Sequence, residues 1–177
     1  MLSRKEIQHL SDEALLDYYH STRNLKAFRQ LYARHKDSLY RYCSQMCAAS
    51  AAGVLEELWR SLLERPPQLC GRLLRSWLFI RLNKLLRNCT DTDNREPAPA
   101  LVDDTLLCGI QQLPRIQRNV LLLHLECELP LATVADIESI SLAACRDHYH
   151  RGREHLDEIL HGPKRQPWRI EEVEVTV

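Results

Sequence analysis

The sequence lacks the features that mark membrane proteins, secreted proteins and most enzymes. Its 177 residues contain no apolar run of about 18 residues and no positively headed apolar leader, so we expect neither a membrane span nor secretion. It also has no phosphate-binding glycine loop, no nucleophile and base pair, and no metal-ligand spacing, which argues against a hydrolase or a transferase. We therefore expect a cytoplasmic protein that is not an enzyme.

Cysteine is present, but not in a pattern that builds a site. The seven cysteines are odd in number and scattered among leucines and tyrosines, which indicates reduced, buried side chains rather than a disulfide framework. Two groupings could begin a metal or redox site, namely Cys43 with Cys47, and Cys145 with His148 and His150. Neither has a second ligand pair at the spacing of a structural zinc site. We expect no bound metal and no cofactor.

Strand-like alternation is absent until the end of the chain. Residues 163–177 include the weakly alternating segment RIEEVEVTV, which could add a strand to a neighbouring sheet edge or form a disordered tail. Before that, apolar residues recur at helical spacing. Residues 90–104 have no periodic apolar face and contain two prolines, which is typical of a linker. The sequence predicts an all-α protein, with two small helical domains joined by a flexible linker.

The part before the linker predicts a bundle of helices. Ser11 and the two acidic residues after it are typical of a helix start, and Asn24 precedes a longer helix. A third helix reaches about Glu64, where Pro66 and Pro67 end it. A fourth helix is expected over about 71–88, where arginines and a lysine lie among leucines.

The formal net charge of zero conceals a division along the chain. Residues 1–95 hold 16 basic and 10 acidic residues, whereas residues 96–162 hold 5 basic and 11 acidic residues. A positive first half suits contact with a polyanion. A negative second half would bind free DNA weakly, and it would need a partner that holds it in place.

Residues 113–160 predict two short helices and a longer third one. Pro114 can begin the first helix, Pro130 opens the second, and Ser141 can cap the third. Two helices joined by a tight turn, with small residues and guanidinium groups on the second, have the shape that enters a DNA major groove. An ordinary helical hairpin with a solvated charged face is the alternative. The polar face of the third helix carries Ala143, Ala144, Arg146, His150, Arg151 and Arg153.

The residues of this segment carry a family resemblance. The run LPRIQRNVLLLHLECELPLATVADIESISLAACRDHYHRGREHL resembles, without a gap, region 4 of the extracytoplasmic-function (ECF) sigma factors of bacterial RNA polymerase, which belong to the sigma-70 superfamily. That domain typically reads L-P-x-x-Q-R-x-V-L-L-L, then a turn ending in I-S, then a basic helix. The matching positions are Leu113, Pro114, Gln117, Arg118, Val120, Leu121, Leu122, Leu123, Ala135, Ile137, Ile140, Ser141, His150, Arg151, Arg153, Glu154 and Leu156.

The first half resembles region 2 of the same family. The segments AFRQLYARHKDSLYRYCSQM, GVLEELWRSLL and LRSWLFIRLNKLLRN are similar to its successive helices. The resemblance implies a region 2-like domain over 1–89, a linker over 90–104, a region 4-like helix-turn-helix domain over 105–162, and a tail over 163–177.

The resemblance also implies a function and its residues. A member of this family binds core RNA polymerase and promoter DNA, has an anti-sigma partner, and leaves catalysis to the polymerase. The residues that match the polymerase-docking helix are Leu55, Glu56, Glu57, Leu58 and Trp59. Those that match the helix capturing the non-template strand of the −10 element are Arg75, Trp77, Arg81, Asn83, Lys84 and Arg87. The polar face of the third helix, given above, matches the reader of the −35 element.

Several contact positions depart from the family pattern. Asp147 and His148 stand where Ser and Arg are common, and a carboxylate repels the phosphate backbone unless it accepts a hydrogen from cytosine. Ser139 replaces a turn glycine, and Gly152 interrupts the third helix. These departures leave two hypotheses. The protein is an alternative sigma factor with unusual promoter preference, or it is a sigma-like regulator or partner-binding module that does not open promoters.

Overall fold

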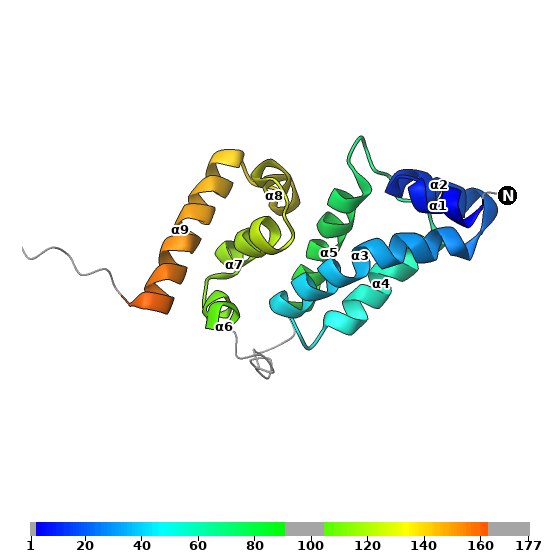
Figure 1. Cartoon of the computed structure of the whole chain (residues 1–177). Coiled ribbons are helices and arrows are strands. Elements are labelled where there is room, and N and C mark those ends of the chain that lie inside the picture. The colour runs from blue at the N-terminus through cyan, green and yellow to red at the C-terminus, as the bar shows by residue number, and fades with distance from the viewer. Residues whose placement is uncertain (1–2, 91–104, 163–177) are drawn as a thin grey trace, which may run out of the picture.

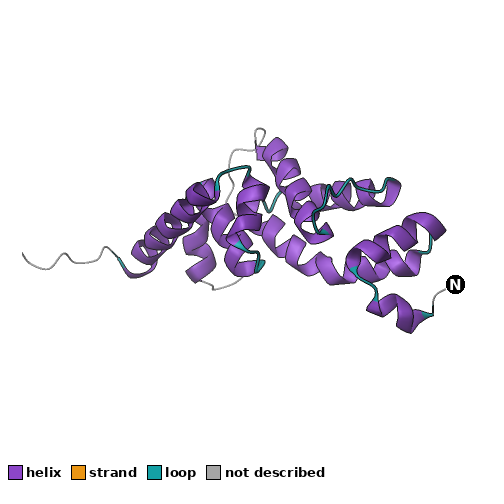
Figure 2. Cartoon of the chain, turned by 90° about the horizontal axis from the view of Figure 1, so that it is seen from above, coloured by secondary structure: helices purple, strands orange, loops and turns teal. Residues whose placement is uncertain are grey.

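The computed structural model describes residues 3–90 and 105–162, and within these ranges every regular element is a helix (Figure 2). The first part contains α1 (Arg4–His9), α2 (Asp12–Thr22), α3 (Leu25–Met46), α4 (Ala51–Glu64) and α5 (Leu74–Thr90). The second contains α6 (Thr105–Gln111), α7 (Arg115–Leu121), the π-helical segment η1 (Leu122–Glu126), α8 (Leu131–Glu138) and α9 (Leu142–His161). The expectation of an all-helical chain in two parts is confirmed. The predicted linker core and the strand-like tail lie outside the described residues.

The helix starts predicted from local capping residues are confirmed. Ser11 caps α2 by accepting a hydrogen bond from the Ala14 amide at 3.2 Å. Asn24 caps α3 in the same way, and Ser141 caps α9 through the Ala144 amide at 3.1 Å. Each cap satisfies an amide that has no partner within the helix.

The start of α5 differs from the prediction, because it lies at Leu74 rather than near residue 71. Cys70 and Gly71 have φ angles of +50° and +77°, so the chain is left-handed there and cannot yet be helical. The Leu74 amide donates instead to Glu13 Oε1 at 2.9 Å. A carboxylate of α2 therefore fixes where α5 begins.

Three elements were not predicted: α1, α6 and η1. For α1 the signal was present, because Ser3 and Glu6 form a capping box in which each side chain accepts from the backbone amide of the other. In η1 the Cys127 amide donates to Leu122 O at 3.0 Å, which widens the helix by one residue. No helix in the described parts of the chain is both long and apolar enough to span a membrane.

The two parts lie against each other, with α5 next to α8 (Figure 1). α3 also contacts η1 across the same boundary. The buried apolar side chains form a single cluster, which in the first part centres on Leu15, Leu31, Leu58, Leu62, Leu78 and Phe79, and in the second on Leu113, Val120, Leu121, Leu123, Val134 and Cys145. The two helical parts are thus in direct contact over α3, α5, η1 and α8.

Candidate nucleic-acid interface

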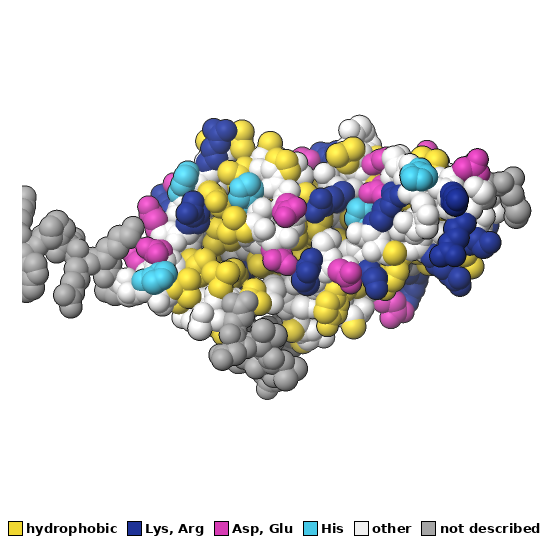
Figure 3. Space-filling model, viewed as in Figure 1, with side chains coloured by type: hydrophobic (Ala, Val, Ile, Leu, Met, Phe, Trp, Pro, Cys, Tyr) yellow, Lys and Arg dark blue, Asp and Glu magenta, His cyan; other side chains and the backbone are white. Residues whose placement is uncertain are grey.

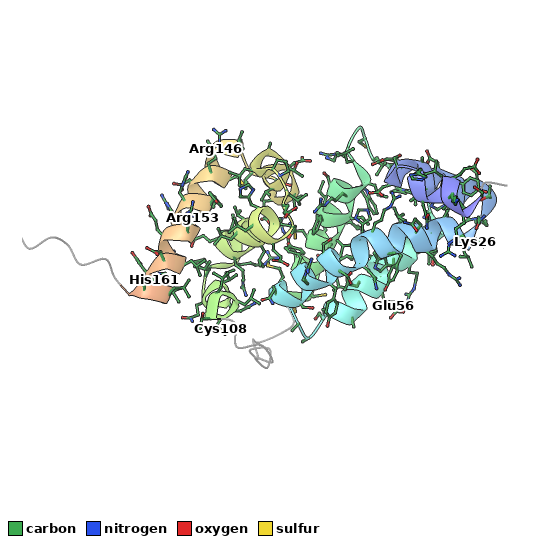
Figure 4. All side chains as sticks on the ribbon, in the orientation of Figure 1. Lys26, Glu56, Cys108, Arg146, Arg153 and His161 are labelled. Atoms are coloured by element: carbon green, nitrogen blue, oxygen red, sulfur yellow. The ribbon has the colours of Figure 1, made fainter. Side chains whose placement is uncertain are left out.

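The exposed face of α9 carries the predicted −35-reading residues. Arg146 and Arg153 point away from the domain into solvent (Figure 4). Ala144 is half-buried, whereas the exposed members of the set are Ala143, Arg146, His150, Arg151 and Arg153. In the space-filling view, arginine and histidine side chains alternate with acidic ones over this helix (Figure 3). The structure therefore brings all of the predicted −35 residues together on one solvent-facing helix.

Two of these arginines have neighbours within α9. Arg151 Nε lies 3.1 Å from Asp147 Oδ2, one helical turn away, in an ion pair between two exposed side chains. The Arg153 guanidinium lies over the Tyr149 ring, 5.7 Å from its centroid. Such a contact orients a guanidinium but leaves its hydrogen-bond donors available to a ligand.

The turn before α9 is made without the usual glycine. Ser139 adopts a left-handed φ of +57°, and the Ile140 amide donates to Ala135 O at 3.0 Å. A non-glycine residue pays a steric cost in this conformation. The two flanking helices are nevertheless set in the helix-turn-helix arrangement that the sequence predicted.

Gly152 has a packing role that the sequence did not show. A Cβ at this position would lie 3.2 Å from Leu121 Cδ1 and 3.3 Å from Gln117 Cβ. Gly152 therefore lets α7 approach α9 closely, and the glycine that costs α9 helical propensity is needed to hold it against the domain.

The predicted −10 residues on α5 divide between two faces. Trp77, Arg81 and Lys84 face an open groove of about 410 Å³ between α5 and the end of α4, which we call the α4–α5 groove. It offers one aromatic ring and three cationic side chains, those of Arg65, Arg81 and Lys84. The other residues that line it are Ser61, Glu64, Pro66, Pro67 and Ile80.

Arg75, Asn83 and Arg87 lie on the opposite face of α5, which contacts the second part of the chain. Asn83 is 1% exposed and donates to Ile137 O at 3.3 Å and to Glu138 Oε1 at 3.1 Å. Arg87 Nη2 lies 3.0 Å from Glu138 Oε2, and Arg75 donates to Cys127 O. The sequence motif did not reveal this division, because it placed all six residues on one helix without their partners.

The predicted polymerase-docking residues are only partly accessible. Glu56 and Glu57 are exposed and pair with Arg60, whereas Leu55 and Trp59 are half-buried. Leu58 is fully buried in the core, so it supports α4 from within.

Tyr32 of α3 is an additional candidate that the sequence analysis missed. It is 43% exposed, and its ring lies 5.0 Å from the Trp59 ring, edge to face. Phe28 lies one turn earlier on α3 and also contacts Trp59, at 6.0 Å between ring centroids. Phe28 and Tyr32 are four residues apart and therefore lie on the same face of α3. This spacing could have predicted an aromatic edge shared by α3 and α4.

Three of the seven cysteines are buried, namely Cys43, Cys127 and Cys145. Burial raises the pKa of the Cys43 and Cys127 thiols to about 12, which keeps both in the unreactive thiol form. Cys145 is also buried, and its Sγ contacts Leu131 O at 3.5 Å. Cys70 and Cys108 are exposed, contrary to the general expectation of burial. Within residues 3–90 and 105–162, no three His, Cys, Asp or Glu side chains are grouped as metal ligands.

Comparison with known proteins finds a family match for the second domain and a shared fold for the chain as a whole. Residues 103–156 match the family described as Sigma-70, region 4. No curated protein matches the chain significantly. The structure of CnrH in complex with the cytosolic domain of CnrY is similar, with a TM-score of 0.67 and 22% identity over 84% of this chain and 96% of that one.

The sigma factor RpoE from Bartonella quintana, solved with the anti-sigma factor NepR, has the same fold. Its TM-score is 0.59, with 18% identity over 76% of this chain and 97% of that one. The resemblance inferred from the sequence is thereby confirmed. Residues 103–156 are thus similar to sigma-70 region 4, and the chain as a whole has the fold of the sigma factor RpoE and of CnrH.

Proposed function

We propose that this protein is an alternative sigma factor of the extracytoplasmic-function type. It binds core RNA polymerase in the cytoplasm and directs transcription initiation at promoters with −10 and −35 elements, and the polymerase supplies the catalysis. One observation carries the proposal, and it concerns α9 in a domain that matches sigma-70 region 4. This helix begins with a capping serine and small residues, and Arg146, Arg151 and Arg153 are exposed to solvent along it. This is the geometry that a recognition helix needs in a major groove.

The −35 element is the proposed ligand of α9. Ala143 leaves room for the helix start to approach base edges, and the arginines further along can bind guanine bidentately or hold phosphates. Asp147 can accept a hydrogen from a cytosine amino group, but it also neutralises part of the charge of Arg151.

The −10 element is the proposed ligand of the α4–α5 groove. Separating a base from its stack costs a few kcal/mol, and an aromatic surface with nearby cations offsets that cost. Trp77 supplies the aromatic surface, and Arg81 and Lys84 supply cations on the same face of α5. The single strand would run along this groove.

Core polymerase is the proposed partner of the exposed edge of α3 and α4. Glu56 and Glu57 provide an acidic rim, and the Tyr32–Trp59 pair provides adjoining aromatic surface. A helical partner with basic side chains fits such an edge. Because RpoE has been solved with an anti-sigma factor, we also propose an anti-sigma partner for this protein.

The test is reconstitution with purified core polymerase, followed by mapping of transcription start sites. We expect new start sites that depend on this protein and that are lost when Arg151 and Arg153 are replaced by alanine. Failure of the wild-type protein to associate with core polymerase at any salt concentration would refute the proposal.

A second function is favoured by a specific observation. Three of the six predicted −10 residues already have partners in the second part of the chain, Arg75 at Cys127 O and both Asn83 and Arg87 at Glu138, so a strand would have to compete with these contacts. A sigma-like regulator that binds the polymerase without opening promoters would have no need of that face. In the same experiment, core association without any new start site would favour this second function.

A further inference from the structure

We propose that α2 fixes the spacing between the two sides of the α4–α5 groove and so positions this groove for the strand of the −10 element. One side of the groove is α5. The other side is the end of α4 with the loop after it, residues 65–73, of which Arg65, Pro66 and Pro67 line the groove. This inference rests on the proposed function of the groove.

The loop is not held in place by the hydrophobic core. Every residue from 65 to 73 is exposed or half-buried, and Leu73 is 68% exposed. Arg72 pairs with Asp136 of α8, but both side chains are exposed, and exposed ion pairs contribute little to stability. Segments with few buried contacts open locally at a low cost in free energy. The position of the loop therefore depends on what holds its two ends.

Side chains of α2 hold the end of α4. Tyr19 Oη donates to Leu63 O at 3.3 Å, and Arg23 Nη1 donates to the same oxygen at 3.0 Å. His20 Nε2 donates to Leu62 O at 3.0 Å. The last carbonyls of an α-helix have no partner within that helix. Three side chains of α2 therefore supply the missing donors.

The sequence explains why α4 needs donors from outside. A carbonyl in an α-helix accepts from the amide four residues later. For Leu62 and Leu63 those residues are Pro66 and Pro67, which have no amide hydrogen. The loop cannot satisfy the end of α4, and α2 does so instead.

The same helix holds the start of α5. Glu13 is half-buried, and its Oε1 accepts from the Leu74 amide at 2.9 Å. A carboxylate at a helix N-terminus also interacts favourably with the helix dipole. Glu13 and His20 are seven residues apart, so they lie on one face of α2, two turns or roughly 10 Å apart along its axis. One rigid helix thus joins both ends of the loop, which passes beside it (Figure 1).

His20 is held in this position at a cost in stability. Its Nδ1 is buried and has no hydrogen-bond partner among the described residues. A buried polar atom without a partner destabilises the fold, and the bond from Nε2 to α4 offsets that cost. The helix that carries His20 is itself fixed in the core by Leu15, Leu16 and Tyr19, which are buried. Through α2, the rigidity of the core reaches both sides of the groove.

The groove depends on the start of α5 because its ligand-binding side chains follow directly. Trp77 lies three residues after Leu74, and Arg81 and Lys84 follow at intervals of about one turn. A strand needs the aromatic ring and the cations at the same time. A shift of Leu74 would move all three side chains relative to Arg65 on the other side. No described residue of α2 lines the groove, so α2 acts as a positioning element.

The experiment separates the reach of the Glu13 side chain from its charge. Glu13→Gln keeps the length of the side chain and an oxygen acceptor, whereas Glu13→Asp keeps the charge but is one methylene too short to reach the Leu74 amide. Both variants are close to the wild type in size, so we expect both to fold. Asp17→Asn is the matched control, because Asp17 is exposed one turn further along α2. His20→Ala tests the contact with α4.

Hydrogen exchange, measured by mass spectrometry on the full chain alone, reports how firmly the loop and the first turn of α5 are held. In Glu13→Asp and His20→Ala we expect exchange in peptides covering residues 65–77 to be about tenfold faster, the effect of losing one partly buried hydrogen bond. Glu13→Gln should stay within about threefold of the wild type, because a neutral acceptor remains. Asp17→Asn should exchange like the wild type.

Promoter opening is then measured with core polymerase on a promoter whose use depends on the wild-type protein. Fluorescence of 2-aminopurine placed in the −10 element reports unstacking of the strand. We expect opening to be reduced about tenfold in Glu13→Asp and His20→Ala and largely retained in Glu13→Gln, in parallel with the loss or retention of the hydrogen bond. Association with core polymerase should be the same in all variants. Residues that merely stabilise the fold would lower association and opening together.

Equal defects in Glu13→Gln and Glu13→Asp would overturn the inference, since charge rather than reach would then explain the effect. Faster exchange with normal promoter opening would also overturn it and would leave the proposed function intact. If the wild type associates with core polymerase but opens no promoter, the proposed function fails and the inference falls with it. The exchange measurement distinguishes these cases, because it shows whether α2 anchors the loop without any reference to promoters.

Discussion

His35 Nε2 on α3 lies 2.7 Å from Asp12 Oδ2 in the first turn of α2, and Arg34 Nη1 lies 2.8 Å from the other oxygen of the same carboxylate. Arg34 also donates to the carbonyls of Gln8 and Leu10, so that one side chain joins the end of α1, the start of α2 and the middle of α3. This cluster fixes the N-terminal helices on the bundle.

The Asp12 cluster predicts how stability depends on pH. Hydrogen bonding to His35 is the main cause that lowers the Asp12 pKa from 3.8 to about 2, with Arg34 contributing. A carboxylate with a lowered pKa stabilises the fold above its unfolded pKa and loses that effect as the pH falls through the folded value. We expect Asp12→Asn to reduce the free energy of unfolding by about 2 kcal/mol at neutral pH.

Urea denaturation at several pH values checks this prediction. The difference between wild type and Asp12→Asn should shrink as the pH falls from about 4 to about 2, where the wild-type carboxylate becomes protonated. Asp37→Asn is the matched control, because it replaces an exposed carboxylate of α3 by a carboxamide, and it should have little effect. A difference that stays constant over this range would show that Asp12 acts through packing alone.

A pair of glycine substitutions tests the close approach of α7 and α9. Gly53→Ala places a Cβ where nothing lies within 4 Å inside α4, so the gain in helix propensity should stabilise the protein by up to about 1 kcal/mol. Gly152→Ala gains the same propensity but meets Leu121 and Gln117 at 3.2 and 3.3 Å. Overpacking typically costs about 1 to 3 kcal/mol, so we expect net destabilisation. Thermal unfolding of the two variants should shift in opposite directions, and a shared upward shift would contradict the packing role of Gly152.

These features show what the sequence could predict. Ser11, Asn24 and Ser141 cap helices through amides two or three residues away, so the local sequence was sufficient to predict these helix starts. The start of α5 depends on Glu13, which lies 61 residues before Leu74. A hydrogen bond between residues so far apart in the sequence leaves no local pattern from which the start of α5 could be predicted.

The candidate site, like the fold, could be predicted from the sequence where it depends on local spacing and not where it depends on distant partners. The α9 face follows from helical periodicity, and the arginines it predicted do share one exposed surface. Leu58 belongs to a spacing of four residues with Val54 and Leu62, which marks the core side of α4, although the family resemblance placed it among docking residues. The partners of Asn83 and Arg87 lie more than fifty residues away, so the sequence could not show that half of the predicted −10 set faces the second domain.

Mutation can separate the proposed polymerase-docking edge of α3 and α4 from the proposed DNA-reading helix α9. Glu57→Arg and Tyr32→Ala should each weaken association with core polymerase several-fold while leaving the fold intact, because both side chains are exposed. Arg151→Ala should leave association unchanged and reduce promoter-specific transcription. Pull-down with core polymerase and run-off transcription, measured on the same preparations, check the division. Equal loss of association in all three variants would contradict it.

Leu58→Ala serves as the contrasting variant for that experiment. Its side chain is fully buried, so truncation should lower the free energy of unfolding by about 2 to 5 kcal/mol. Any loss of polymerase association should then follow the loss of folded protein in a circular dichroism melt. If Leu58→Ala instead weakened association at a temperature where it stays fully folded, Leu58 would belong to the docking surface after all.

Asp147 offers the sharpest test of the proposed contact between α9 and DNA. Its carboxylate pairs with Arg151 at 3.1 Å and so removes one positive charge from the proposed DNA-facing surface. Asp147→Ser should free Arg151 for a phosphate, which would strengthen polymerase-dependent promoter binding several-fold at low salt and steepen its salt dependence by about one phosphate contact. Glu158→Ser, on the same helix but close to its C-terminal end, should change neither quantity. A salt dependence that stays the same while affinity falls would show that Asp147 accepts a hydrogen bond from a base, and that its contribution lies in sequence recognition rather than in charge.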